Sequence, residues 1–182
     1  MGKHILITGH PGVGKTTLIR KIAEALGAKA GGFYTQEIRV GRERVGFGIQ
    51  TLAGVTGTLS HKAIHSRRRV GKYGVDVEAF ESVALPALRG ALREKEFIII
   101  DEIGPMEECS EPFKDLVVQC LNSEKRVLAT IKERGSRFVE TIKARDDCRI
   151  FHLDLGNRDR AAEEILKAIA LGARRTPGQS AE

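Results

Sequence analysis

The chain has 182 residues, of which 41% are hydrophobic and 30% are charged, and its formal net charge is +6. This length and composition predict one soluble globular domain and exclude a disordered or fibrous chain. The positive charge suits a polyanionic ligand, but it does not separate a nucleotide from a nucleic acid.

Membrane and secreted proteins are not expected from this sequence. No apolar run approaches the roughly 20 residues that a membrane-spanning helix needs. The first predicted strand begins at Lys3, which leaves no room for a signal peptide. The three cysteines are widely spaced and form no CxxC pair, so we expect reduced, buried thiols in a cytoplasmic protein.

Predicted strands and helices alternate along most of the chain, which is typical of an α/β fold. A single domain is expected over residues 1–172, followed by a disordered tail over residues 173–182. Residues 54–60 are rich in turn formers, and the basic segment after them is expected to be a loop. Pro86 is expected to kink or split the helix that contains it. We expect strands over 4–8, 33–40, 45–52, 96–100, 126–131 and 149–153, and helices over 15–26, 77–93, 110–121, 136–143 and 157–171.

The first loop carries a phosphate-binding motif. Its residues 9–16 read Gly-His-Pro-Gly-Val-Gly-Lys-Thr, which fits the P-loop pattern G-x-x-x-x-G-K-[ST] between a predicted strand and a predicted helix. The glycines allow the backbone N–H groups to face phosphate oxygens, and the helix N-terminus adds the positive end of its dipole. Lys15 is expected to bind the β- and γ-phosphates, and Thr16 to bind Mg²⁺. The predicted nucleotide contacts are Gly9, His10, Pro11, Gly12, Val13, Gly14, Lys15, Thr16 and Thr17.

A second motif follows the apolar strand over residues 96–100. Asp101 takes the place of the Walker B aspartate, which orders magnesium. Glu102 can polarise a water molecule against the γ-phosphate, which favours hydrolysis over transfer to another acceptor. With Ile103 and Gly104, the acids also form the D-x-x-G pattern of GTPases, but no guanine-reading [NT]-K-x-D follows. We therefore expect weak base selectivity, with residues 101–104 as further nucleotide contacts.

The hairpin strands over 33–40 and 45–52 lie between the two motifs in the chain. An extra strand next to the P-loop strand is typical of the RecA-like division of P-loop proteins. In that division, a polar residue at the end of the next strand senses the γ-phosphate, and Thr130 fits this position. We predict a RecA-like P-loop NTPase fold, with a mostly parallel central sheet flanked by helices and a small antiparallel β insertion.

Several arginines are candidates for a catalytic role. An arginine that stabilises the transition state of phosphoryl transfer contributes about 10³ to 10⁵ in rate. Arg158 and the run Arg67-Arg68-Arg69 are the candidates, although each also fits ordinary surface charge. If none of them reaches the γ-phosphate, turnover by the isolated chain is expected to be slow.

Further segments resemble one particular protein family. The most specific are Gly-Phe-Tyr-Thr-Gln-Glu at 32–37, Val-Gly-Lys-Tyr-Gly-Val-Asp at 70–76 and Asp-Glu-Ile-Gly-Pro-Met-Glu at 101–107, together with 129–131 and 157–158. With the P-loop, they resemble the small nucleoside-triphosphatases of heat-loving microbes, a family with a human cancer-related member. The resemblance spans residues 3–171 and implies a RecA-like fold and slow, magnesium-dependent hydrolysis of nucleoside triphosphates. The chain departs from the family pattern at Pro105, where a lysine is usual, and at Lys132, where a proline is common.

Three functions fit these features. The first is a magnesium-dependent nucleoside triphosphatase that hydrolyses ATP, GTP, CTP and UTP with broad base tolerance, acting as a monomer. The second is a nucleoside or polynucleotide kinase, which predicts that an acceptor takes labelled phosphate faster than water does. The third is an RNA- or DNA-binding module with a weak NTPase switch, whose binding falls steeply with salt. For the first, the predicted catalytic residues are Glu102, Lys15, Thr130 and Arg158, and the predicted magnesium ligands are Thr16 and Asp101.

Overall fold

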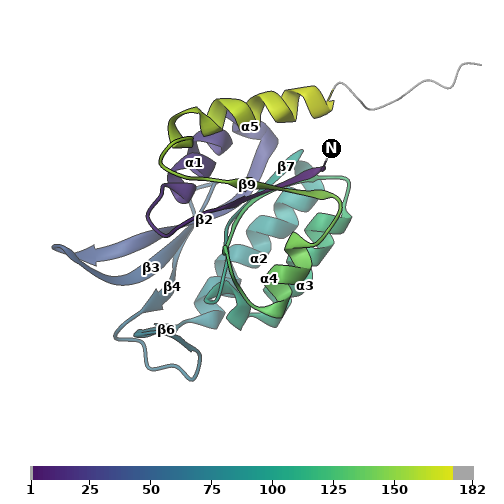
Figure 1. The fold of residues 1–182 in the computed structure, drawn as a ribbon. Helices are drawn as coiled ribbons and strands as arrows, with labels where there is room; N and C mark the ends of the chain where they lie inside the picture. The colour runs from purple at the N-terminus through teal and green to yellow at the C-terminus, as the bar shows by residue number, and fades with distance from the viewer. Residues whose placement is uncertain (1, 174–182) are drawn as a thin grey trace, which may run out of the picture.

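The computed structural model describes residues 2–173 as one nine-stranded sheet with helices on both faces (Figure 1). Apart from Ala173, the predicted tail lies outside the described residues. None of the described helices is both long and apolar enough to cross a membrane. The strands are β1 (His4–Thr8), β2 (Ala30–Val40), β3 (Glu43–Thr51), β4 (Thr56–His61), β5 (Arg69–Val70), β6 (Tyr73–Val75), β7 (Phe97–Ile103), β8 (Arg126–Ile131) and β9 (Cys148–His152). The helices are α1 (Lys15–Leu26), α2 (Val77–Glu94), α3 (Glu111–Asn122), α4 (Arg137–Lys143) and α5 (Arg158–Ala173), with short 3-10 turns at Gly27–Lys29 and Glu107–Cys109.

The parallel part of the sheet has the order β2-β7-β8-β1-β9. The strand between β1 and β7 is β8, in which Thr130 lies opposite Ile7 of β1. The prediction that a hairpin strand lies next to the P-loop strand is therefore wrong, because β2 pairs with the far side of β7. Strand order depends on the sheet face that each connecting helix crosses, and the order of motifs along the chain does not encode it.

Antiparallel strands extend the sheet beyond β2 (Figure 1). The predicted hairpin is present, with Phe33 of β2 opposite Thr51 of β3. Two local predictions are wrong: residues 54–60 contain most of β4, and the basic segment contains β5 and leads into β6. Gly57 and Ser60 within β4 favour turns, but pairing with β3 buries Leu59 and Ser60 almost completely, and this tertiary pairing outweighs local preference.

A glycine is required where β2 leaves β7 to pair with β3. Gly32 has a φ of +121°, and a Cβ added there would lie 2.0 Å from the carbonyl oxygen of Ile99. A side chain at this position would therefore both strain the backbone and collide with β7.

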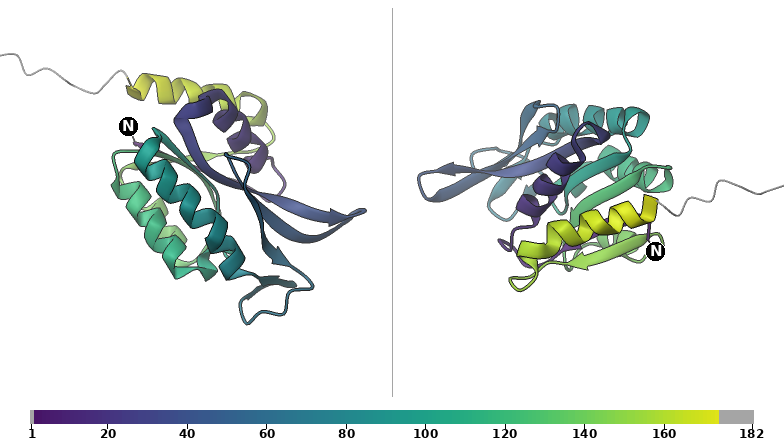
Figure 2. Two further views of the ribbon diagram at one scale, coloured as in Figure 1. Left: turned by 180° about the vertical axis from the view of Figure 1, so that it is seen from behind. Right: turned by 90° about the horizontal axis from the view of Figure 1, so that it is seen from above.

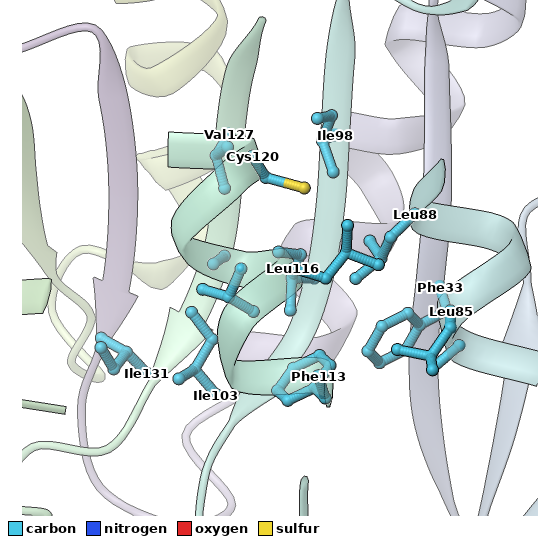
Figure 3. Close-up of a cluster of buried hydrophobic side chains, with 14 of the residues drawn as sticks. Phe33, Leu85, Leu88, Ile98, Ile103, Phe113, Leu116, Cys120, Val127 and Ile131 are labelled. Atoms are coloured by element: carbon cyan, nitrogen blue, oxygen red, sulfur yellow. The ribbon is translucent and has the colours of Figure 1, made fainter. Parts of the chain in front are cut away.

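Helices cover both faces of the parallel strands (Figure 2). On one face, α1 and α5 pack over Ile5 and Ile7 of β1; on the other, α2, α3 and α4 pack over a larger core that includes Leu6. Side chains of a strand alternate between its faces, so a strand covered on both sides is apolar throughout. The larger core contains Phe33 and Phe113, which lie together in Figure 3.

The helix α2 begins as predicted and does not split. The side chain of Asp76 accepts a hydrogen bond from the Ala79 N–H at 2.9 Å, which caps the first turn. Pro86 lies within the continuous helix on an exposed face, so water can satisfy the Ser82 carbonyl that loses its helical partner. All three cysteines are free thiols, but only Cys120 is buried, which raises the pKa of its thiol to about 12.

The variant Phe113→Ala is expected to lower the free energy of unfolding by about 3–5 kcal/mol, the usual cost of removing a buried aromatic ring. The Phe113 ring is fully buried, and its centroid lies 5.3 Å from that of Phe80 and 6.1 Å from that of Phe33. Equilibrium denaturation in urea measures the loss. Phe138→Ala is the control, because Phe138 is only partly buried against the same core. Equal losses in the two variants would contradict the central position of Phe113.

Candidate functional site

The loop between β1 and α1 has the geometry of a phosphate cradle. Gly9, Gly12 and Gly14 have φ values of +146°, +80° and +109°, in the region that favours glycine. The helix α1 begins at Lys15, so its N-terminal N–H groups lie at the end of the loop. The Lys15 ammonium donates to the carbonyl oxygens of Gly9 at 2.8 Å and His10 at 3.3 Å. The loop is therefore folded around the cation that is predicted to bind phosphate.

Asp101 lies at the same edge of the sheet and joins the predicted site residues. Its carboxylate accepts hydrogen bonds from the Thr130 hydroxyl and, at 3.4 Å, from the Thr35 N–H. The Asp101 side chain is almost completely buried. Burial raises the pKa of Asp101, whereas these two hydrogen bonds, the nearby Thr16 hydroxyl and the charge of Lys15 oppose the rise. The strand order thus brings together one residue from each of α1, β2, β7 and β8.

The donor set around Asp101 fits a magnesium ion. Magnesium prefers oxygen ligands and is usually held by one or two protein groups, with water and substrate phosphates completing its shell. The Thr16 hydroxyl and the Asp101 carboxylate are such groups, and a cation would offset the cost of burying the carboxylate. Among residues 2–173, no group of three histidine, cysteine or acidic side chains is arranged to hold a metal.

Two further acids lie beside Asp101. The Glu102 carboxylate makes no hydrogen bond within the described part of the chain; burial raises its pKa, and the charges of Lys132 and Lys15 oppose the rise. A Cβ added to Gly104 would lie 3.3 Å from the carboxyl carbon of Glu102 and 3.3 Å from Oε2 of Glu107, so both acids border one point. Burial also raises the pKa of Glu107 well above its ordinary value. Glu102 is therefore left free to bind a water molecule.

Polar residues next to the P-loop were not predicted from the sequence. Thr8 Oγ1, one residue before the loop, is the buried side-chain polar atom that lacks a hydrogen-bond partner within residues 2–173. The Glu133 carboxylate lies 3.8 Å from Nδ1 of His10 and 3.4 Å from Nε2 of His152, so it links the P-loop to the end of β9. Thr8 could have been found from the sequence, because it directly precedes the P-loop motif. No sequence pattern marks Glu133 or His152.

A cavity of about 510 Å³ lies between the P-loop and the loop after β9. Its apolar walls include Pro11, Val13, Leu153 and Leu155, of which Leu155 is 73% exposed. The Asp154 carboxylate faces its own loop, where it accepts from the N–H groups of Gly156 at 2.7 Å and Asn157 at 2.9 Å. The cavity is therefore mostly apolar, and the acid in its lining is held through Oδ1 by its own loop. The lining residues are His10, Pro11, Gly12, Val13, Leu153, Asp154, Leu155 and Gly156.

Two of the candidate arginines, Arg158 and Arg69, contact their own surroundings. Arg158 begins α5 near this cavity, with its half-exposed guanidinium 3.6 Å from Asp159. The run 67–69 lies in the antiparallel extension, where the Arg69 guanidinium donates to the carbonyls of Lys72 at 2.9 Å and Ile64 at 3.4 Å. In this structure neither group hydrogen-bonds to the residues around Asp101.

A larger cavity, of about 740 Å³, lies between α1 and α2 and contains none of the predicted site residues. One of its walls is Tyr34, whose ring is covered by the Arg20 guanidinium at 4.1 Å from the ring centroid. The predicted site residues thus lie at the P-loop edge of the sheet and not in the larger cavity.

Comparisons with known proteins identify the family of the chain. A family model described as NTPase matches residues 4–166. The chain belongs to this NTPase family. A nucleoside-triphosphatase named THEP1 from Thermotoga petrophila is 51% identical over 165 residues, covering 91% of this chain and 92% of that protein. The human cancer-related nucleoside-triphosphatase is 40% identical over 185 residues, covering 93% of this chain and 97% of that protein.

A solved structure of the family supports the fold as well. The crystal structure of THEP1 from Aquifex aeolicus has a TM-score of 0.86 and 44% identity, covering 91% of this chain and 98% of that chain. The predicted resemblance to this family and the predicted α/β P-loop fold class are both confirmed.

Proposed function

We propose that the chain is a magnesium-dependent nucleoside triphosphatase that hydrolyses ATP, GTP, CTP and UTP to diphosphate and inorganic phosphate with little selection among bases. One observation carries this proposal: the Thr130 hydroxyl holds Asp101 near the Thr16 hydroxyl that begins α1, and the Glu102 carboxylate next to it has no hydrogen-bond partner among residues 2–173. Membership of the NTPase family and the names of the relatives support the same reaction class.

Each residue of the site takes a distinct part in this reaction. Lys15 and the N–H groups of the P-loop bind the phosphates. Thr16 and Asp101 hold magnesium, which when bound neutralises charge on the phosphate oxygens. Thr130 is a positioning residue that orients Asp101 through its hydroxyl. Glu102 orients a water molecule and accepts its proton as the water oxygen bonds to the γ-phosphorus; the bond to the β–γ bridging oxygen breaks, and the diphosphate leaves.

Weak base selectivity follows if the base occupies the cavity beside the P-loop. Pro11 and Leu155 would contact either face of a base, and such apolar contact does not depend on the pattern of donors and acceptors on its edge. Discrimination among the four bases would need polar side chains committed to a base edge, and the Asp154 carboxylate is already bonded within its loop.

Phosphate release from ATP, GTP, CTP and UTP, measured with magnesium and with a chelator, tests the proposal. We expect kcat/KM for the four substrates to agree within about tenfold, because an apolar slot discriminates weakly. Activity is expected to disappear with the chelator. A preference for one base of about 10²-fold or more would contradict broad tolerance. Release that continues without a divalent ion would contradict the roles of Thr16 and Asp101.

A further inference from the structure

Lys132 stands at the edge of the sheet that carries the candidate site. It follows β8 directly and lies two residues after Thr130, whose hydroxyl bonds Asp101. In an extended chain this spacing returns a side chain to the same side of the sheet. The pairing of Ile131 with Ile103 of β7 fixes the end of β8 against the strand that bears the acids. Lys132 is therefore placed at the phosphate end of the site and away from the base cavity.

The charge of Lys132 acts on two acids of the site. It lowers the pKa of Glu102 more than Lys15 does, and it also lowers the pKa of the buried Glu107. Both carboxyls border one point beside Gly104, so this charge acts on the part of the site that holds the acids.

Among residues 2–173, no acidic side chain pairs with this cation. The Lys132 residue is half-buried, and its ammonium makes no ion pair and no hydrogen bond within the same residues. The adjacent Glu133 carboxylate faces His10 and His152, and the nearby Lys143 ammonium is bonded to the Glu133 carbonyl at 2.7 Å. A lysine ammonium without a protein partner at this place suits an anion that binds from solvent.

We propose that Lys132 binds the γ-phosphate of the substrate as a second cation beside Lys15 and stabilises the charge that develops on it during hydrolysis. The inference rests on the proposed triphosphatase function and identifies the group that completes its site. A cation aimed at the γ-phosphate oxygens acts most strongly when charge on them is greatest, so its effect falls on kcat. The Arg158 guanidinium lies 3.6 Å from Asp159 and Arg69 is bonded to its own turn, whereas Lys132 makes no such contact within residues 2–173 and directly follows the strand that carries Thr130.

The variant Lys132→Met tests this role, because it removes the charge and keeps the length of the side chain. We expect kcat to fall by about 10²-fold, as for removal of one group that stabilises transition-state charge. Affinity for a non-hydrolysable triphosphate with magnesium is expected to fall by about tenfold, the size of one charged hydrogen bond, while affinity for the diphosphate stays unchanged. Lys132→Arg should restore most of both losses.

Lys125→Met is the matched control, since Lys125 is half-buried just before the opposite end of β8. It should behave as wild type. Wild-type kcat and triphosphate affinity in Lys132→Met would overturn the inference, and so would equal losses of triphosphate and diphosphate affinity. If Lys132→Met does not fold, as judged by circular dichroism, Lys132→Gln gives the same comparison. The ratio of triphosphate to diphosphate affinity needs no turnover, so it can fail or hold independently of the triphosphatase proposal, which fails if wild type releases no phosphate.

Discussion

Glu102→Gln is expected to bind magnesium and ATP like wild type and to lose about 10²- to 10⁴-fold in kcat, the range contributed by a positioned general base. Glutamine has nearly the same shape but cannot accept the proton of the attacking water. The Glu102 carboxylate makes no hydrogen bond within the described residues, so the substitution breaks no contact of the fold. Phosphate release at saturating ATP measures kcat, and titration calorimetry with a non-hydrolysable analogue measures affinity.

The control for this variant is Glu96→Gln. Glu96 is exposed and lies just before β7, at the end of the strand away from the P-loop. It should turn over at the wild-type rate. Wild-type turnover in Glu102→Gln would show that Glu102 is not the general base. The next candidate would then be Glu107, which borders the same point near Gly104.

Lys15→Ala is expected to weaken the binding of ATP with magnesium by about 10²-fold, since a hydrogen bond to a charged group contributes up to about 3 kcal/mol. Hydrolysis should fall with it. In the structure the Lys15 ammonium lies 2.8 Å from the Gly9 carbonyl oxygen, inside the loop that the phosphates would enter. Calorimetric titration of the variant with the non-hydrolysable analogue measures the loss.

Lys21→Ala is the matched control, because Lys21 is an exposed lysine on the same helix. It should retain wild-type affinity. Circular dichroism and thermal unfolding of both variants show whether the protein still folds when the Lys15 side chain is removed from the P-loop. An unchanged dissociation constant in a folded Lys15→Ala variant would contradict the assignment of Lys15 to the phosphates.

The local parts of the site could be predicted from sequence because each lies within one short segment. The P-loop pattern needs two glycines, a lysine and a threonine or serine at fixed spacing, and the strand before Asp101 is apolar over residues 97–100. Strand order could not be predicted in this way, because β8 reaches its place between β1 and β7 only when the helices pack on the two faces.

The groups around Glu102 could not all be predicted from the sequence, because their positions also depend on strand order. Lys132 belongs to a different segment from Glu102, and its effect on the pKa of Glu102 depends on the end of β8 lying against β7. The strand β4 was missed because its stability comes from pairing with β3 and not from the preferences of its own residues.

The antiparallel strands are joined to the half of the site that bears the acids. Their first member, β2, pairs with β7, and the Thr35 N–H reaches the Asp101 carboxylate at 3.4 Å just beyond that pairing. The P-loop belongs to β1, which has β8 and β9 as its neighbours. A displacement of the antiparallel strands would therefore reach Asp101 through β2 and Thr35, whereas no antiparallel strand pairs with the strand that leads into the P-loop.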